Sequence, residues 1–157
     1  DLLAYAERRL PSPAEASDAL GDALEIIWRK SSKVPREDTP ARMYMFVVLR
    51  NVMLNARRGA ARRDAATIRL REVLEAGRRA GADEVRRSDI ALDVEAAISA
   101  LPAAQAELVR LIHWDGFAIT EAAEIMGVNA STARSRYAAA RLALRERLTT
   151  ASADRRR

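Results

Sequence analysis

The chain has 157 residues, of which 49% are apolar and 31% charged, and this globular composition excludes both a disordered tail and a membrane protein. It contains no cysteine, which excludes a disulfide framework, a thiolate metal site and a cysteine nucleophile. Lys and Arg number 27 against 22 Asp and Glu, so the net charge is +5 and nucleic acid is the first candidate partner. Because aromatic residues make up only 4% and alanine, leucine and arginine dominate, we predict an all-α fold.

The first predicted module covers residues 1–70 and opens with two helices. Pro11 and Pro13 end the first helix and allow a second to start near Ala14. In this second helix, three apolar side chains at i, i+4 and i+7 are predicted to face the core: Leu20, Leu24 and Ile27. Carboxylates with the same spacing lie on the opposite face: Asp18, Asp22 and Glu25. This acidic face is either an ordinary solvated surface or a docking surface.

Pro35 and Pro40 interrupt the chain before a third helix, which we predict to be the centre of the module. From Met43 to Leu49 every side chain is apolar or Tyr44, so the helix is enclosed on most sides. Asparagines and arginines follow it: Asn51, Asn55, Arg57, Arg58, Arg62 and Arg63. Guanidinium groups bind phosphate oxygens in pairs, which makes the arginine cluster a candidate phosphate-binding surface. A basic helix end that complements the helix dipole explains the same residues, and both interpretations stay open.

Residues 71–93 are predicted to form a linker, because they contain Gly77 and Gly81 and show no sustained helical stripe. The second module, residues 94–150, is predicted to contain helices at 94–100, 102–114, 119–126 and 130–148. Gly127 can supply the positive φ that ends the third of these helices, and Asn129 is a good N-cap for the fourth. A short helix, a glycine-bearing turn and a longer helix form a helix-turn-helix. Residues 151–157 are expected to be a frayed tail.

The last helix has the pattern of a recognition helix for duplex DNA. On a helical wheel its core side carries Ala133, Tyr137, Ala140, Leu144 and Leu148. Small or apolar residues face away from that side: Ser131, Ser135, Ala138 and Leu142. Arg134 and Arg141 flank this outward strip on one side, and Thr132 and Arg136 flank it on the other. Small residues let a helix enter the major groove, while flanking arginines reach phosphates or guanine edges.

The sequence gives little support to an enzyme. His113 is the only histidine and is more readily explained as a packed or half-exposed helix residue than as a base or ligand. Asp18 and Asp22 are too few for a metal site, and there is no glycine-rich phosphate loop or nucleophile elbow. We expect no metal and no cofactor. With no apolar run near 20 residues and no leader pattern, we also expect no membrane insertion and a cytoplasmic location.

Two stretches of the chain resemble bacterial sigma factors, most closely the small extracytoplasmic-function (ECF) subgroup of the sigma-70 family. Region four of that family is similar to ALPAAQAELVRLIHWDGFAITEAAEIMGVNASTARSRYAAARLALRERL. Region two is similar to EASDALGDALEIIWRK followed by ARMYMFVVLRNVMLNARRG. The two matches occur in the family's order with a short linker between them. The resemblance therefore implies a subunit that directs core RNA polymerase to promoters.

The resemblance also implies roles for individual residues. It implies docking on the β′ clamp coiled coil of polymerase by Asp18, Asp22, Glu25 and Trp28. It implies that the helix from Arg42 to Asn55 and a loop after it bind the minus-ten element. The residues implied are Arg42, Tyr44, Arg50, Asn51, Asn55, Arg57, Arg58, Arg62 and Arg63. It implies binding of the minus-thirty-five element by Ser131, Thr132, Arg134, Ser135, Arg136 and Arg141. Further implied partners are the β flap of polymerase and an anti-sigma factor.

Three residues depart from the family pattern. Tyr44 stands where tryptophan is frequent, Leu24 where an aromatic residue is common, and Gly21 where glutamine is usual. Tyr44 can still stack on a base, whereas Gly21 removes one polar contact to polymerase. The alternative hypothesis is a free-standing helix-turn-helix regulator that binds a palindrome as a dimer. Such a regulator would not need a first module with both an acidic face and an arginine-rich helix.

Overall fold

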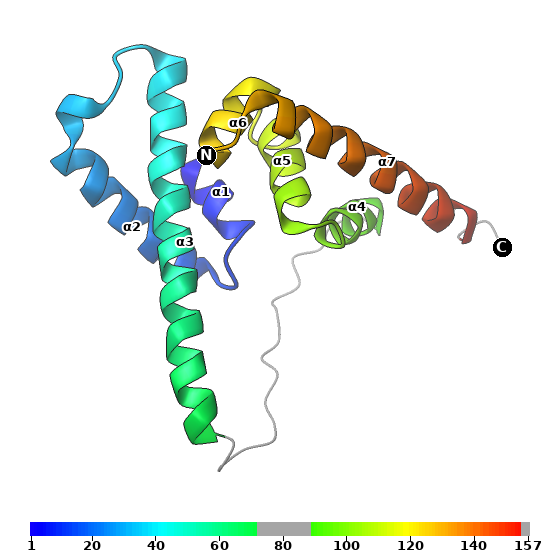
Figure 1. The fold of residues 1–157 in the computed structure, drawn as a ribbon, viewed down its shortest axis with the longest axis horizontal. Helices are drawn as coiled ribbons and strands as arrows, with labels where there is room; N and C mark the ends of the chain where they lie inside the picture. Colours follow the sequence, from blue (N-terminus) through cyan, green and yellow to red (C-terminus); the bar gives the residue numbers. More distant parts are fainter. Residues whose placement is uncertain (72–88, 155–157) are drawn as a thin grey trace. The chain divides into compact units, whose positions relative to one another are not determined.

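The computed structural model describes residues 1–71 and 89–154, with side chains described for residues 1–59 and 94–149. The described residues form helices α1 to α7 and one short 3-10 turn, so the all-α prediction is confirmed (Figure 1). The chain divides into two compact units, Asp1–Ala82 and Asp83–Arg157. Each unit is described on its own below.

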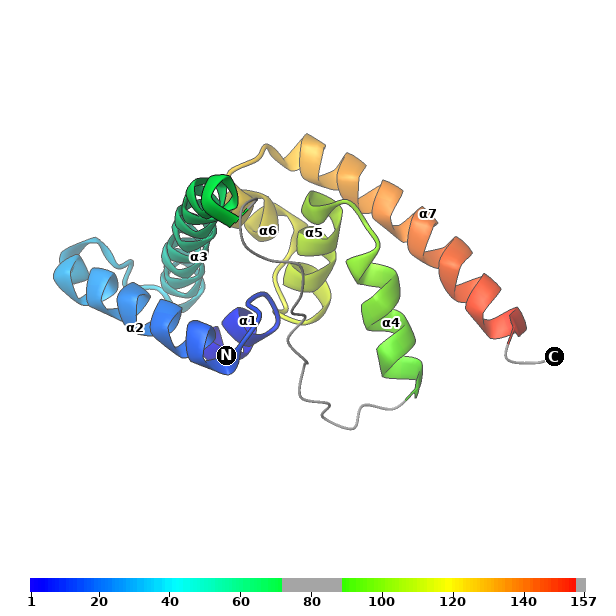
Figure 2. The same cartoon turned by 90° about the horizontal axis from the view of Figure 1, so that it is seen from below.

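The first unit contains α1 (Leu2–Glu7), α2 (Pro13–Arg29), the 3-10 turn η1 (Ser31–Lys33) and α3 (Asp38–Arg71). Ser12 caps α2, because its Oγ accepts a hydrogen bond from the backbone N–H of Glu15 at 3.2 Å, and Pro13 occupies the first helical position. The break between α1 and α2 lies where the sequence predicts it, and Pro35 lies in the break between α2 and α3. The prediction is wrong at Pro40, because α3 already begins at Asp38 and Pro40 lies in its first turn, where a proline is tolerated. Helix α2 runs beside α3 in both views (Figures 1 and 2).

Tyr5 of α1 and Phe46 of α3 are fully enclosed at the centre of this unit. Their ring centroids lie 4.9 Å apart with an interplanar angle of 67°, an edge-to-face contact that aromatic pairs favour. Leu49 is buried one turn after Phe46. Helix α2 contributes only small side chains to the buried set: Ala16, Ala19 and Ala23. These alanines allow α2 to approach its neighbours closely.

The predicted inward stripe of α2 is wrong at Leu24. That side chain is 49% exposed, whereas Leu20 and Ile27 are half-buried. The helix is rotated so that its alanines, and not Leu24, meet α1 and α3. Leu24 consequently joins the solvent side of α2.

Helix α3 corrects the predicted loop after Asn55. The helix continues without a break through Gly59 to Arg71. A glycine inside a helix costs about 1 kcal/mol relative to alanine, and the surrounding alanines and arginines are good helix formers that offset this cost. The arginine cluster therefore lies on helix α3 and not on a loop. Figure 1 shows the green, C-terminal part of α3 extending past α1 and α2.

The second unit contains α4 (Asp89–Ser99), α5 (Ala103–His113), α6 (Ile119–Met126) and α7 (Ala130–Asp154). The predicted linker, residues 71–93, is too long at its C-terminal end, because α4 begins at Asp89 and not at residue 94. Asp89 suits this position, since an acidic residue is favourable at the positive end of a helix dipole. Positions 72–88 of the linker, with Gly77 and Gly81, lie outside the described residues. The predicted tail is also partly wrong, since α7 continues to Asp154.

Buried side chains from all four helices fill the second unit. The largest of them are Leu108, Leu111 and Ile125, and α7 adds Ala133 and Ala140, which are fully buried. At its half-buried edge, Arg110 of α5 forms an ion pair with Glu95 of α4 at 3.0 Å. No helix in the described parts of the chain is long and apolar enough to cross a membrane.

The turn between α6 and α7 forms as predicted. Gly127 adopts φ +67°, the left-handed conformation that ends α6. The Oδ1 atom of Asn129 accepts a hydrogen bond from the backbone N–H of Thr132 at 2.7 Å and so caps α7. Gly127 and the Asn129 cap together determine where α7 begins.

Gly127→Ala is expected to lower the free energy of unfolding of the second unit by about 1–2 kcal/mol, because L-residues are strained at positive φ. Gly21→Ala is the matched control and is expected to stabilise α2 by about 0.5–1 kcal/mol, because Gly21 lies inside a helix with open space around it. Trp28 and Trp114 lie in different units, so denaturation followed by fluorescence in single-tryptophan variants resolves the two effects. Equal effects of the two substitutions would contradict the role of the turn.

Candidate nucleic-acid interface

The exposed face of α2 carries an acidic strip made of Asp18, Asp22 and Glu25, all exposed. At about 100° per residue, these three positions fall within roughly 60° of one another on the helix. Glu25 forms an exposed ion pair with Arg29 at 2.6 Å. Trp28, which is 82% exposed, lies one turn after Leu24 beside the strip. A carboxylate strip bordered by exposed apolar side chains suits a partner surface that is basic and apolar.

The candidate residues on α3 divide into two groups. Four of them fall within about 60° of one another on the side of α3 opposite Phe46: Tyr44, Asn51, Asn55 and Arg58. We call these four residues the outer strip of α3. Asn51, Asn55 and Arg58 are exposed, while Tyr44 is half-buried. An aromatic ring, two amides and a guanidinium on one helix face can stack on and hydrogen-bond to unpaired bases.

Three further α3 candidates, Arg42, Arg50 and Arg57, do not lie on the outer strip. Arg42 is half-buried, and its guanidinium lies 5.0 Å from the centroid of the Phe46 ring. Arg50 is half-buried and Arg57 is exposed, both on the Phe46 side of the helix. Arg62 and Arg63 continue the helical backbone, but their side chains lie outside the described set. Of the seven minus-ten candidates whose side chains the structure describes, four therefore lie together on the outer strip.

The candidate residues on α7 gather in its first two turns. Ser131, Arg134 and Ser135 are exposed, and Thr132 and Arg136 are half-buried. The cap also orders this end of the helix, because the Ser131 hydroxyl donates a hydrogen bond to Oδ1 of Asn129 at 2.8 Å. The predicted outward strip and core side are thus confirmed as the exposed and buried sides of α7. Arg141, also exposed, lies two turns further along.

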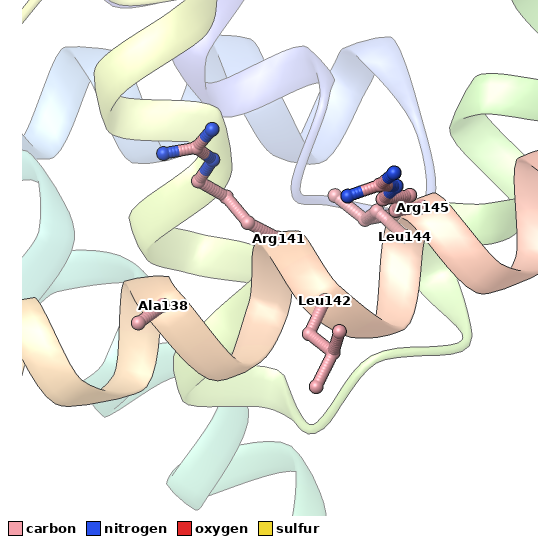
Figure 3. A pocket seen from close by; sticks show the side chains of 5 residues that line it. All are labelled: Ala138, Arg141, Leu142, Leu144 and Arg145. Atoms are coloured by element: carbon pink, nitrogen blue, oxygen red, sulfur yellow. The ribbon is translucent and has the colours of Figure 1, made fainter.

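Beyond these two turns α7 carries exposed apolar side chains between its arginines. Figure 3 shows this part of the helix, where a shallow, open hollow is lined by Ala138, Arg141, Leu142, Leu144 and Arg145. Leu142 is 61% exposed. The Leu142 side chain has no polar atom and offers no hydrogen bond to a partner.

The structure also shows a contact that the sequence does not reveal. His113, at the end of α5, is exposed, and its Nε2 lies 2.8 Å from the hydroxyl oxygen of Tyr137 on α7. The two residues are 24 positions apart, so no local periodicity links them.

In the described parts of the chain, no group of three His, Cys, Asp or Glu side chains is arranged to hold a metal ion.

The two units together define a class of protein: a helical unit with an acidic face on α2 and a polar strip on α3, followed by a helix-turn-helix unit. Family models agree with this division, since residues 1–63 match sigma-70 region 2 and residues 91–144 match sigma-70 region 4. The ECF RNA polymerase sigma factor SigL of Mycobacterium tuberculosis is 27% identical over 147 residues, covering 90% of this chain and 78% of SigL.

A solved structure gives the same result. The sigma factor RpoE of Bartonella quintana, crystallised in complex with the anti-sigma factor NepR, matches with a TM-score of 0.70 and 26% identity, covering 94% of this chain and 89% of RpoE. The chain belongs to the sigma-70 family, in its ECF subgroup. It is a transcription initiation factor that binds RNA polymerase, and the alternative of a free-standing regulator is set aside because region 2 precedes region 4.

Proposed function

We propose that the acidic strip of α2 docks on the β′ clamp coiled coil of core RNA polymerase, with Trp28 as an apolar anchor. The observation that carries this assignment is the exposure of three carboxylates on one helix face next to an 82% exposed tryptophan. Such a surface is complementary to a basic, partly apolar helix pair. The second unit contacts the β flap in the same complex.

The outer strip of α3 captures the melted minus-ten element in this proposal. Tyr44 stacks on an unpaired base, Asn51 and Asn55 hydrogen-bond to base edges, and Arg58 holds the backbone. Arg42, Arg50, Arg57, Arg62 and Arg63 add positive charge along the same helix, which favours the strand electrostatically. Their part in the proposal is binding of phosphates and not of bases.

The first two turns of α7 read the minus-thirty-five element as duplex DNA. Ser131, Ser135 and Thr132 present hydroxyls to the major groove, while Arg134 and Arg136 reach guanine edges. Arg141 lies two turns after Arg134 on the same side of the helix, and binds phosphate. No catalytic step is assigned to the chain, which acts in the cytoplasm through polymerase.

The likeness to RpoE also supports an anti-sigma partner for this chain. RpoE, a sigma factor of the same fold, is bound by the anti-sigma factor NepR in its crystal structure. We propose the same kind of regulation here.

Tyr44→Ala tests the minus-ten assignment. Loss of a stacked base costs about 1–3 kcal/mol, so promoter opening by holoenzyme is expected to fall by at least about fivefold. Tyr44→Phe keeps the ring and is expected to open promoters normally. Permanganate reactivity of unpaired thymines measures opening, and core polymerase alone gives the background. Equal opening by wild-type and Tyr44→Ala holoenzyme would contradict the assignment.

A further inference from the structure

The first turns of helix α7 meet the rest of the unit mostly through small side chains, and Leu144 packs against the same core further along the helix. Ala133 and Ala140 are fully buried, and Tyr137 lies between them on the same side of the helix. The Tyr137 ring packs against a cluster of buried residues: Ile98, Leu101, Ala106, Val109 and Ala140. Alanine side chains have no shape that distinguishes one rotation of a helix from the next. Tyr137 is therefore the side chain in these turns that can set the rotation of α7.

The outer end of Tyr137 is held by His113. The Tyr137 hydroxyl oxygen lies 2.8 Å from Nε2 of His113, and the two rings are stacked with centroids 6.0 Å apart and an interplanar angle of 30°. A tyrosine hydroxyl can donate to a neutral imidazole nitrogen or accept from a protonated one. The hydrogen bond is thus compatible with both charge states of His113. It joins the last residue of α5 to the second turn of α7, the proposed reading helix.

We infer that His113 is a positioning residue for promoter recognition: through Tyr137 it sets the rotation of α7 and so the direction of Arg134 and Arg136. Arg136 directly precedes Tyr137, and Arg134 lies three residues before it. Binding side chains must be held within about 0.5 Å and 10–20° of their productive geometry. A hydrogen bond at Tyr137, within one turn of both arginines, restrains that angle. The inference rests on the proposed reading of duplex DNA by α7.

The test compares sequence preference with general DNA affinity. Holoenzyme made with the full chain first selects duplexes from a pool with a randomised upstream window. Binding of selected and unselected duplexes is then measured for Tyr137→Phe and His113→Phe, which keep the ring stacking but lose the hydrogen bond. We expect the ratio of the two affinities to fall about three- to tenfold in either variant, with affinity for unselected DNA unchanged. His113→Gln, whose amide can bond to the Tyr137 hydroxyl, is expected to keep the wild-type ratio.

Two further readouts make the test decisive. The double variant His113→Phe/Tyr137→Phe is expected to lose no more than either single variant, because both remove the same bond. His113 is the only histidine, so its imidazole ¹⁵N signal is unique and is expected to shift in Tyr137→Phe. A ratio within twofold of wild type in both single variants would overturn the inference while leaving the proposed function intact. If the wild-type holoenzyme selected no sequence from the pool, both the inference and the proposed reading of duplex DNA by α7 would be overturned.

Discussion

Replacing both Arg134 and Arg136 with alanine abolishes most of the preference for promoters that depend on an upstream element. A bidentate contact between an arginine and a base is worth about 1–3 kcal/mol of discrimination. If Arg134 or Arg136 makes such a contact, its loss lowers promoter preference about five- to 150-fold. Arg134 is exposed and Arg136 half-buried, so little of the core is disturbed. Run-off transcription from competing promoters with and without the upstream element measures the effect.

Arg145→Ala/Arg147→Ala is the matched control for this experiment. Both arginines are exposed on α7, and the control removes the same charge beyond the first two turns of the helix. It is expected to weaken binding to all DNA slightly and to leave promoter choice unchanged. If the Arg134/Arg136 variant kept the wild-type promoter choice, α7 would not be the reading helix.

Charge reversal on α2 is expected to have a comparable effect on polymerase binding. Asp18→Lys/Asp22→Lys places two positive charges against the proposed basic surface, and like charges brought together at an interface cost several kcal/mol. Affinity for core polymerase is expected to fall by more than about tenfold. Because both side chains are exposed, the fold should be unaffected, with stability changed by no more than about 0.5 kcal/mol per site.

The matched control here is Glu7→Lys/Glu37→Lys. Both residues are exposed in the same unit, outside α2, and the net charge changes by the same amount. Affinity for core polymerase, measured at several salt concentrations, is expected to fall far less in the control. Normal binding by a folded Asp18→Lys/Asp22→Lys variant would show that polymerase docks elsewhere.

Elements set by local chemistry could be predicted from the sequence. The bounds of α6, the left-handed Gly127 and the Asn129 cap depend on a few adjacent residues, and all three were expected. The buried side of α7 also follows from a single helical period. Helix α3 was harder, because one glycine signals a break that its alanine and arginine neighbours overcome.

Features that depend on packing between distant segments could not be predicted. Leu24 was placed inward because leucine counts for more than alanine on a wheel, yet closely packed α1 and α3 accept only the alanines of α2. The division of the arginines between the two sides of α3 depends on where Phe46 packs. The hydrogen bond between His113 and Tyr137 joins two helices, and the sequence pattern of neither helix predicts it.

The most direct test of the central claim is run-off transcription with this chain and core RNA polymerase freed of its own sigma factor, on fragmented genomic DNA of the source organism. The account predicts discrete transcripts that core polymerase alone does not produce, and their start sites would define the promoter elements. A folded chain that binds core polymerase but yields no transcript beyond the background of core alone would contradict the account.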